Sequence, residues 1–202
     1  FKKPFSKISD QSNEFIHKTF DVALKLLKEN FSNCLINGPV SKKHFLKKKF
    51  LGITEYLQKK TKIKNETTMI IYNEKLSVSP LTTHLPLKQV AKKISIKKIV
   101  NSSKQINNFY TSKIQKKPKI AILGLNPHCE TVDKFSEEDK IIKPAIKILK
   151  KKNIHVSGPF PADTFFLKKN IEKFDIVIGM YHDQVLTPIK TLFNFNAINI
   201  TL

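Results

Sequence analysis

The chain has 202 residues with 40% hydrophobic side chains, and its 37 basic and 16 acidic residues give a formal net charge of +21. This length is enough to bury a sizeable core, and the hydrophobic content excludes a disordered tail. The sequence has no uninterrupted apolar run of about 18 residues, which excludes a transmembrane helix. Its two cysteines, Cys34 and Cys129, cannot build a disulfide scaffold, so we expect a protein of a reducing cytoplasm.

The positive charge raises the question of a nucleic-acid partner. Every basic residue is a lysine, however, and the lysines are spread along the whole chain. Proteins that read bases or clamp phosphates favour the planar guanidinium group of arginine. A solvated, lysine-rich surface explains the charge more simply, so we expect neither a nucleic acid nor a membrane as partner. The positive field would still favour a small anionic substrate.

The first half of the chain predicts two helices and three strands. Apolar residues recur at helical spacing over residues 15–31, with lysines on the opposite side. A short apolar run at residues 33–36 predicts a strand that ends at a turn with Gly and Pro. Residues 68–72 and 76–79 have the composition of strands and lie so close together that we expect a hairpin. The next helix is expected over residues 89–107.

Strands and helices alternate in the second half of the chain. Buried strands are expected at residues 119–125, 154–156 and 175–180. Helices are expected between them, at residues 136–151 and 163–172. The last residues of the chain again form a strand-like run. This alternation predicts an α/β fold with a mostly parallel sheet.

Three of the six histidines follow the ends of predicted strands. His84 comes after the strand that ends near residue 79, His128 after the strand that ends at 125, and His182 after the strand that ends at 180. Ligands of open α/β sheets bind beyond the carboxyl ends of the strands. Three imidazoles gathered there would hold one divalent metal and leave a coordination position open, as catalytic sites do. Imidazole suits several metals, so the identity of the ion stays open.

A simpler interpretation of these residues also stands. A histidine in a loop is often only a hydrogen-bonded polar group, and the three separations match no known metal-binding motif. The carboxylates of Asp163 and Asp183 could complete or orient the coordination, although Asp163 could equally be a helix N-cap. Cys129 is more simply a small buried side chain than a soft metal ligand.

Residues that bind a nucleotide or a phosphate are not evident from local motifs. The segment at residues 37–42 places a Gly and Lys42 after an apolar run, which could cradle an anion, but a turn before a helix explains it equally well. With 5 glycines, the chain contains no Gly-x-Gly-x-x-Gly fingerprint. The residues that bind a cofactor therefore stay unknown.

Five segments, taken together and in their order along the chain, resemble the 4-hydroxythreonine-4-phosphate dehydrogenase family of vitamin B6 biosynthesis. They are Asn37-Gly38-Pro39-Val40-Ser41-Lys42, Thr82-Thr83-His84-Leu85-Pro86-Leu87, Gly124-Leu125-Asn126-Pro127-His128, Gly158-Pro159-Phe160-Pro161-Ala162-Asp163-Thr164 and Met180-Tyr181-His182-Asp183-Gln184, and the match closes with Asn199-Ile200-Thr201-Leu202. The resemblance covers residues 34–202 and looks like the middle of the enzyme. We therefore expect an internal fragment that is incomplete at both ends.

The resemblance implies a fold and an assembly. The family folds as two α/β/α subdomains around a cleft, similar to the isocitrate and isopropylmalate dehydrogenases. Residues 1–202 would then be part of a single dehydrogenase domain. The family implies a homodimer with the active site at the subunit interface.

The resemblance also implies roles for individual residues. The three metal-binding histidines of the family fall on His84, His128 and His182. Asp163 matches a carboxylate beside the metal, and we regard Asp163 and Lys190 as the catalytic candidates. The substrate-binding positions of the family fall on Thr54, Lys190 and Asn199.

The activity implied is a metal-dependent oxidation by NAD or NADP. The substrate would be 4-phosphooxy-L-threonine, and the β-keto acid formed would lose CO2 to give 3-amino-2-oxopropyl phosphate for pyridoxal 5'-phosphate synthesis. The ion would be Zn, Mg or Co. The family has a histidine where this chain has Ile53, so oxidation of a four-carbon sugar acid 4-phosphate stays open as an alternative. A metallohydrolase that uses the three histidines, with Asp163 or Glu130 as base, is a further alternative.

Overall fold

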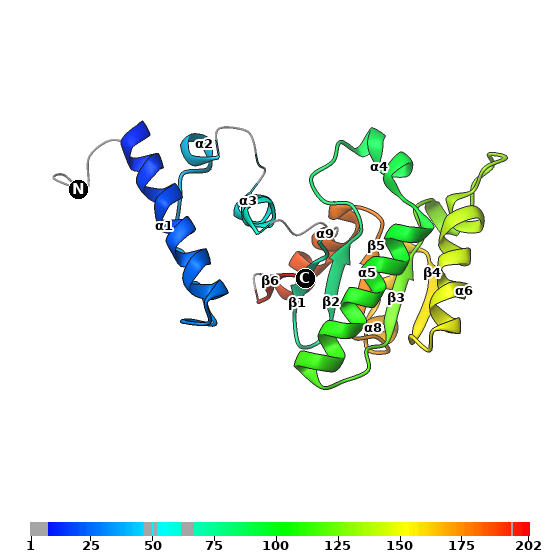
Figure 1. Cartoon of the computed structure of the whole chain (residues 1–202). Helices are drawn as coiled ribbons and strands as arrows, with labels where there is room; N and C mark the ends of the chain where they lie inside the picture. The colour runs from blue at the N-terminus through cyan, green and yellow to red at the C-terminus, as the bar shows by residue number, and fades with distance from the viewer. Residues whose placement is uncertain (1–7, 47–49, 51, 62–66, 195) are drawn as a thin grey trace. The chain divides into compact units, whose positions relative to one another are not determined.

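A computed structural model of the chain describes residues 8–46, 50, 52–61, 67–194 and 196–202 (Figure 1). The chain forms two compact units, Phe1–Asn65 and Glu66–Leu202, and each has a hydrophobic core of its own. The expectation that residues 1–202 belong to one dehydrogenase domain stays a prediction. Among the described residues, no helix combines the length and the hydropathy that crossing a membrane requires.

The described part of the first unit is built from helices, which are α1 (Asp10–Lys28), α2 (Lys42–Phe45) and α3 (Ile53–Lys60). Helix α1 begins where the hydroxyl of Ser9 accepts a hydrogen bond from the backbone N–H of Ser12. The helix predicted over residues 15–31 is confirmed, with both ends shifted toward the N-terminus. The core of this unit is a hydrophobic cluster of Phe20, Phe45, Leu46 and Tyr56, with Ile53 partly buried against it.

The strand predicted at residues 33–36 is wrong. This segment has no regular secondary structure, and the side chain of Ile36 is 90% exposed. An apolar run becomes a strand only where neighbouring backbone groups pair with it. The described residues of the first unit contain no strand that could supply such a partner.

The second unit contains a six-stranded sheet with the strand order β4-β3-β5-β2-β1-β6. Strands β4, β3, β5 and β2 run parallel to one another, whereas β1 is antiparallel to both β2 and β6. The predicted α/β fold with a mostly parallel sheet is therefore confirmed. In chain order the strands are β1 (Met69–Tyr72), β2 (Ser77–Pro80), β3 (Ile120–Leu123), β4 (Val156–Phe160), β5 (Ile176–Gly179) and β6 (Ile198–Thr201).

Strands β1 and β2 form the predicted hairpin, in which Ile71 lies opposite Val78. The strand predicted at residues 154–156 exists as β4 but is longer than expected. Gly158 and Pro159 have the composition of a turn, yet both belong to the strand. Strand β4 lies at the edge of the sheet, where a proline without an N–H is tolerated.

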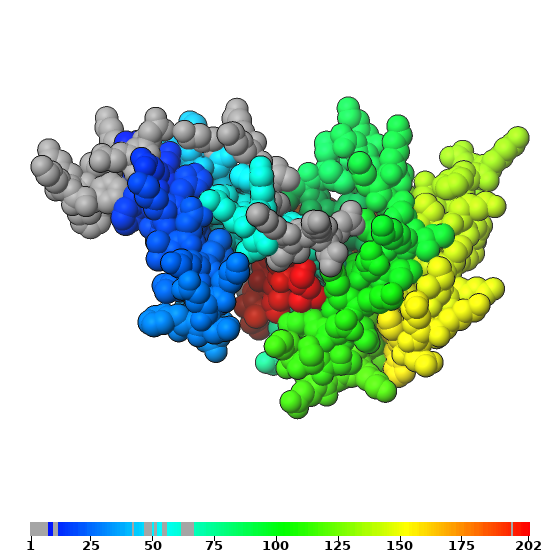
Figure 2. All heavy atoms as spheres, in the orientation of Figure 1, coloured from blue at the N-terminus to red at the C-terminus, as the bar shows by residue number. Residues whose placement is uncertain are grey.

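Alternate side chains of the strands fill a core on each face of the sheet. On one face, Ile120 and Ile122 pack with helices α5 (Ile96–Phe109) and α6 (Lys143–Lys151). On the other face, the remaining residues of β3 pack with helix α9 (His182–Phe193). Figure 1 shows α5 in front of the sheet and α9 behind it, and in Figure 2 the atoms of α5 (green) form part of the front surface, beside visible atoms of the C-terminal strand (red). The sheet is therefore the middle of three layers.

The single helix predicted over residues 89–107 is wrong, because the chain forms two helices there. Helix α4 (Leu87–Lys93) ends before Ser95, and α5 begins directly after it. The Ser95 hydroxyl accepts a hydrogen bond from the backbone N–H of Lys98 at 3.2 Å, which makes Ser95 the N-cap of α5. The apolar pattern continues across Ser95, so the sequence predicts one helix where this serine starts a second one.

The predicted helix at residues 163–172 is likewise divided, into α7 (Ala162–Phe165) and α8 (Lys168–Ile171). Helix α9 was not predicted at all. Pro188 lies inside α9, and a proline in an apolar stretch usually indicates a helix end. Burial of the apolar side of α9 against β2 and β5 outweighs that local cost.

The helix predicted over residues 136–151 is confirmed, but its first part is wider than an α-helix. A π-helical turn (Glu138–Ile142) leads into α6. The Ser136 hydroxyl accepts a hydrogen bond from the backbone N–H of Asp139 at 3.2 Å, as a helix cap does. A π-helical turn interrupts the regular ladder of backbone hydrogen bonds. Pro144, which has no N–H to donate to such a ladder, lies just after this turn.

Candidate active site

Each of the three predicted metal-binding histidines lies just beyond the carboxyl end of a parallel strand. His84 follows β2, His128 follows β3, and His182 follows β5 as the first residue of α9. Parallel strands end on the same side of a sheet, so the three loops share one edge. We call this the carboxyl edge, formed by the residues that follow Pro80, Leu123, Phe160 and Gly179. The opposite side, where these strands begin, is the amino edge.

His84 and His182 form a pair at this edge. Their ring centroids lie 6.0 Å apart. The Nδ1 atom of His182 lies 2.7 Å from Oδ1 of Asp183, a hydrogen-bond distance. A histidine that donates its Nδ1 proton to a carboxylate presents the Nε2 lone pair to a metal. The Asp183 carboxylate therefore favours the tautomer of His182 that can act as a ligand.

His128 forms a second pair, with Asp163. Oδ2 of Asp163, in the first turn of α7, lies 3.9 Å from Nδ1 of His128. His128 lies in a one-turn 3-10 helix (Pro127–Cys129) and has a φ angle of 56°, in the left-handed region. For a residue other than glycine, this backbone conformation costs free energy and is often found at functional sites. The loop thus holds His128 in a conformation that an unconstrained chain would seldom adopt.

The structure brings the predicted ligands together as two pairs. In the part of the chain that the structure describes, no three His, Cys, Asp or Glu side chains lie close enough to hold one metal ion. The chemistry of the donor set fits a divalent cation, because imidazole and carboxylate are both ligands of Zn²⁺. One copy of this chain therefore presents the expected donor types at one edge without gathering them at one point.

A buried carboxylate, Glu138, holds the loop that carries His128. Its Oε1 atom accepts hydrogen bonds from the backbone N–H groups of Leu125 and Asn126, at 2.7 and 2.8 Å. Its Oε2 atom accepts one from the Asn126 side-chain amide at 2.9 Å. Burial acts to raise the pKa of Glu138, but the hydrogen bonds from Asn126 and Leu125 outweigh it, so the pKa lies below its ordinary value. Glu138 is therefore charged in the folded protein at neutral pH.

Cys129 follows His128 and is half-buried. Burial raises the pKa of the Cys129 thiol, and the nearby charge of Glu138 raises it further. The thiolate, which is the form that binds metals, is thereby disfavoured. The structure agrees with the interpretation of Cys129 as a small packed side chain.

The three predicted substrate-binding residues lie away from the histidines of the second unit or outside it. Lys190 is exposed in α9, eight residues after His182, and eight residues of α-helix extend about 12 Å. Asn199 is in β6, opposite Ile71, and β6 is separated from β2 by strand β1. Thr54 belongs to α3 of the first unit, and its side chain, like that of Lys42, lies outside the described part of the structure.

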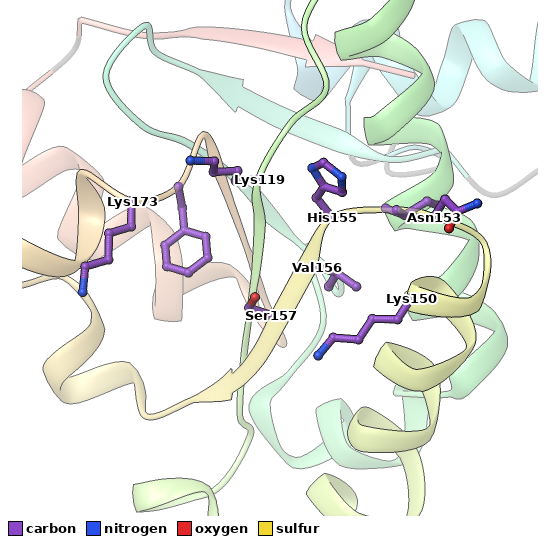
Figure 3. Close-up of a pocket in the computed structure, with 9 residues that line it drawn as sticks. Lys119, Lys150, Asn153, His155, Val156, Ser157 and Lys173 are labelled. Carbon is purple, nitrogen blue, oxygen red and sulfur yellow. The ribbon is translucent and has the colours of Figure 1, made fainter.

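A hollow of about 530 Å³ lies at the amino edge, on the opposite side of the sheet from the histidines (Figure 3). Its lining includes three lysines, Lys119, Lys150 and Lys173. The other lining residues are 153–157, at and before the start of β4, and Phe174, which lies shortly before β5. Figure 3 shows the three labelled lysine side chains with their amino groups pointing in different directions. The hollow thus collects positive charge without a convergent set of donors.

Comparison with known proteins identifies the family. A family model described as pyridoxal phosphate biosynthetic protein PdxA matches residues 2–202. The chain belongs to this family. The resemblance predicted from the sequence motifs is therefore confirmed, and the α/β fold of this PdxA chain agrees with it.

Similar proteins carry dehydrogenase names. The 4-hydroxythreonine-4-phosphate dehydrogenase of Sulfurihydrogenibium sp. (strain YO3AOP1) is 40% identical over 184 residues, which cover 89% of the PdxA chain and 56% of that protein. A protein of Oceanobacillus iheyensis named "Putative D-threonate 4-phosphate dehydrogenase" is 33% identical over 203 residues, with 98% of this chain and 60% of that protein covered.

A solved structure agrees with these sequences. The crystal structure of 4-hydroxythreonine-4-phosphate dehydrogenase from Klebsiella pneumoniae matches with a TM-score of 0.82 and 29% identity, covering 96% of this chain and 60% of that one. The PdxA chain thus spans less than two thirds of the length of these relatives.

Three buried polar residues at the carboxyl edge were not assigned a role from the sequence. They are Thr82, Glu138 and Gln184, and each makes hydrogen bonds inside the protein. Thr82 and Gln184 lie within two residues of predicted ligands, and this closeness was the available signal. Glu138 gives no such signal, because a glutamate near the start of a helix is usually exposed.

Proposed function

We propose that the protein oxidises 4-phosphooxy-L-threonine with NAD or NADP in pyridoxal 5'-phosphate synthesis, and that the β-keto acid then loses CO2 to give 3-amino-2-oxopropyl phosphate. The observation that carries the proposal is the placement of three histidines beyond the carboxyl ends of three parallel strands in a PdxA-family chain. The names of the relatives support the substrate.

The residues proposed to hold a divalent metal, whether Zn, Mg or Co, are His84, His128 and His182. When bound, the ion would polarise the substrate hydroxyl as a Lewis acid. Asp183 fixes the tautomer of His182 for this role. Asp163 lies beside His128, where its carboxylate can accept a proton or orient the imidazole.

Lys190, Thr54 and Asn199 are proposed to hold the substrate. Lys190 supplies a positive charge for the phosphate or the carboxylate, and it is also a candidate to exchange a proton with the substrate. Thr54 and Asn199 supply polar side chains that orient the substrate.

We further propose that the protein is a homodimer with its active site at the subunit interface. Two features of the chain support this. The predicted ligands form two pairs within the described residues of one copy, and Lys190 lies about two helical turns from His182. A second copy that supplied ligands or Lys190 would complete the site.

A second candidate substrate is a four-carbon sugar acid 4-phosphate, such as D-threonate 4-phosphate. The relative from Oceanobacillus iheyensis carries that substrate in its name. Ile53 is compatible with either substrate, because it packs against the hydrophobic core of the first unit and has no side-chain hydrogen-bonding group that would select an amino acid.

The test is a direct comparison of the two substrates with the purified full-length protein. Formation of NADH or NADPH is followed with 4-phosphooxy-L-threonine and with D-threonate 4-phosphate, with each of the three metals and after treatment with a chelator. We expect turnover that depends on metal and is faster with 4-phosphooxy-L-threonine. Faster oxidation of D-threonate 4-phosphate would favour the second candidate, and metal-dependent hydrolysis without nicotinamide reduction would overturn both.

A further inference from the structure

A buried polar network joins the loops that carry the three histidines, and Gln184 lies at its centre. Gln184 is in the first turn of α9, and only 9% of it is exposed. Its Oε1 atom accepts a hydrogen bond from the backbone N–H of Met180 at 2.7 Å. Its Nε2 atom donates a hydrogen bond to the carbonyl oxygen of Gly124 at 2.8 Å. Both ends of the amide are therefore used within the protein.

These two hydrogen bonds connect the loop after β5 to the loop after β3. Met180 precedes His182 by two residues, and Gly124 precedes His128 by four. One side chain thus sets the distance between two histidine-bearing loops. Because the groups are buried, loss of the amide would leave a backbone N–H and a backbone carbonyl without partners, which is costly.

A glycine at the end of β5, Gly179, and another directly after β3, Gly124, leave room for this network. A Cβ atom at Gly179 would lie 2.4 Å from Cγ1 of Val185 and 3.1 Å from Oε1 of Gln184. A Cβ atom at Gly124 would lie 2.7 Å from Sγ of Cys129. A side chain at Gly179 would therefore force Val185, in α9, to shift, and a side chain at Gly124 would force Cys129, beside His128, to shift.

Thr82 connects the loop that carries His84 to Met180. Its hydroxyl donates a hydrogen bond to the carbonyl oxygen of Met180 at 2.7 Å, and Thr82 is 1% exposed. Thr82 precedes His84 by two residues. Both backbone groups of Met180 are therefore used: its N–H donates to Oε1 of Gln184, and its carbonyl oxygen accepts from the Thr82 hydroxyl.

Glu138 holds the far side of the His128 loop. Glu138 accepts hydrogen bonds from the backbone N–H groups of Leu125 and Asn126. These two residues directly follow Gly124, whose carbonyl oxygen accepts the hydrogen bond from Gln184. The His128 loop is thus fixed at three consecutive residues. Gln184, Thr82 and Glu138 thus each form a hydrogen bond with the backbone of a loop that carries a histidine.

We propose that Gln184 and Thr82 are positioning residues that hold His84, His128 and His182 in place for metal binding. This inference rests on the proposed function, since it assumes that the three histidines bind a metal ion. It adds that affinity for the ion depends on side chains that do not touch it. Residues that orient metal ligands typically change metal affinity by about 10–100-fold when they are removed.

The test measures binding of Co²⁺ alone to the full-length protein, by titration and by the visible absorption of the bound ion. In the Gln184→Met variant, which keeps the volume and removes both hydrogen bonds, we expect Co²⁺ to bind roughly 10–100-fold more weakly. We also expect a changed absorption spectrum, because the spectrum reports the coordination geometry.

Thr82 provides a milder pair of variants in case Gln184→Met does not fold. Thr82→Val removes the hydroxyl at almost constant volume, and we expect several-fold weaker Co²⁺ binding, on the order of a single lost hydrogen bond. Thr82→Ser keeps the hydroxyl and should bind Co²⁺ as the wild type does. Tyr110→Phe is the matched control, because it removes a buried hydrogen bond at the amino edge and should leave Co²⁺ binding unchanged.

The outcomes separate this inference from the proposed function. If the wild type does not bind Co²⁺, or if His84→Ala binds it equally well, the proposed metal site is wrong and this inference falls with it. If the wild type binds Co²⁺ through the histidines but Thr82→Val and Gln184→Met bind it unchanged, this inference alone is overturned. It is also overturned if Tyr110→Phe weakens binding as much as Gln184→Met does, because the effect would then be general destabilisation.

Discussion

The two edges of the parallel sheet both bury polar groups, but they use them differently. At the amino edge, the Tyr110 hydroxyl donates a hydrogen bond to Oγ of Ser77 at 2.9 Å, and Oδ2 of Asp175 accepts one from the backbone N–H of Lys119 at 2.7 Å. These bonds join the starts of strands to each other and to Tyr110, the residue that follows α5. At the carboxyl edge, the bonds of Gln184 and Glu138 hold loops that carry histidines.

The difference agrees with the proposal that the polar groups of the carboxyl edge serve an active site, whereas those of the amino edge serve stability. Burial raises the pKa of Tyr110 to about 12, so its hydroxyl stays protonated and acts only as a donor and acceptor of hydrogen bonds. The carboxyl edge presents imidazoles and carboxylates beside a backbone held in the left-handed conformation at His128. Stability alone does not explain that arrangement, because such a backbone conformation costs free energy.

The strongest test of this comparison replaces one histidine by alanine at each edge. We expect His128→Ala to lower metal-dependent turnover by roughly a thousand-fold, because a polarising ion contributes several kcal/mol and each 1.36 kcal/mol is a factor of ten. His155→Ala, at the exposed start of β4, should leave turnover unchanged. The measurement is kcat/KM of the full-length protein at saturating metal. Equal activity of both variants would remove the functional distinction between the edges.

Replacement of Glu138 by glutamine should have the second largest effect, and this effect is a loss of stability. The neutral amide can accept at only one of the two positions that Glu138 uses, so at least one buried donor loses its partner. We expect a loss of about 2 kcal/mol in the free energy of unfolding at neutral pH, measured by urea denaturation.

The pH dependence identifies the charge of Glu138 as the cause. Because the pKa of Glu138 is lowered in the folded state, its carboxylate stabilises the fold above its ordinary value of 4.5, and this stabilisation is lost as the pH falls below that value. The difference in unfolding free energy between wild type and Glu138→Gln should therefore shrink below about pH 4.5. A difference that stayed constant with pH would show that packing, and not charge, is responsible.

The same two edges show how much of the fold and of the candidate site could be predicted from the sequence alone. The parallel strands β3 and β5 were predicted because a strand buried on both faces is a continuous apolar run. The strand ends then located the three histidines, since the topology of an α/β sheet determines where loops gather. Helix α9 and the division of α4 from α5 were missed, because Pro188 and Ser95 have local meanings that tertiary packing decides.

The supporting side chains could not be predicted from the sequence. Glu138 lies beside another glutamate in a lysine-rich helix, and its burial depends on a loop that returns from β3. Gln184 is one polar residue among many, and its role appears only when Met180 and Gly124 are placed on either side of it. Hydrogen bonds between residues far apart in the sequence leave no local pattern.

Tyr110→Phe should have a smaller effect than Glu138→Gln and only on stability. The variant removes a neutral hydroxyl that hydrogen-bonds to Oγ of Ser77 and, at 3.3 Å, to the carbonyl oxygen of Asp175. The ring stays packed, so we expect a loss of about 1 kcal/mol in the free energy of unfolding. Urea denaturation measures this loss, and kcat and KM measured on the same sample should equal those of the wild type. A change in KM would mean that the amino edge also contributes to the site.

Replacement of a lysine at the amino-edge hollow should have the smallest effect of all. The hollow is lined by three lysines, but their amino groups point in different directions, so they form no convergent site for a phosphate (Figure 3). We therefore expect Lys150→Ala to change KM for 4-phosphooxy-L-threonine by less than about two-fold, whereas Lys190→Ala should raise it by about ten-fold or more, as loss of a charged hydrogen bond does. If Lys150→Ala raised KM as much as Lys190→Ala, the phosphate would bind at the amino edge, because only a direct contact with one of these lysines gives so large a change.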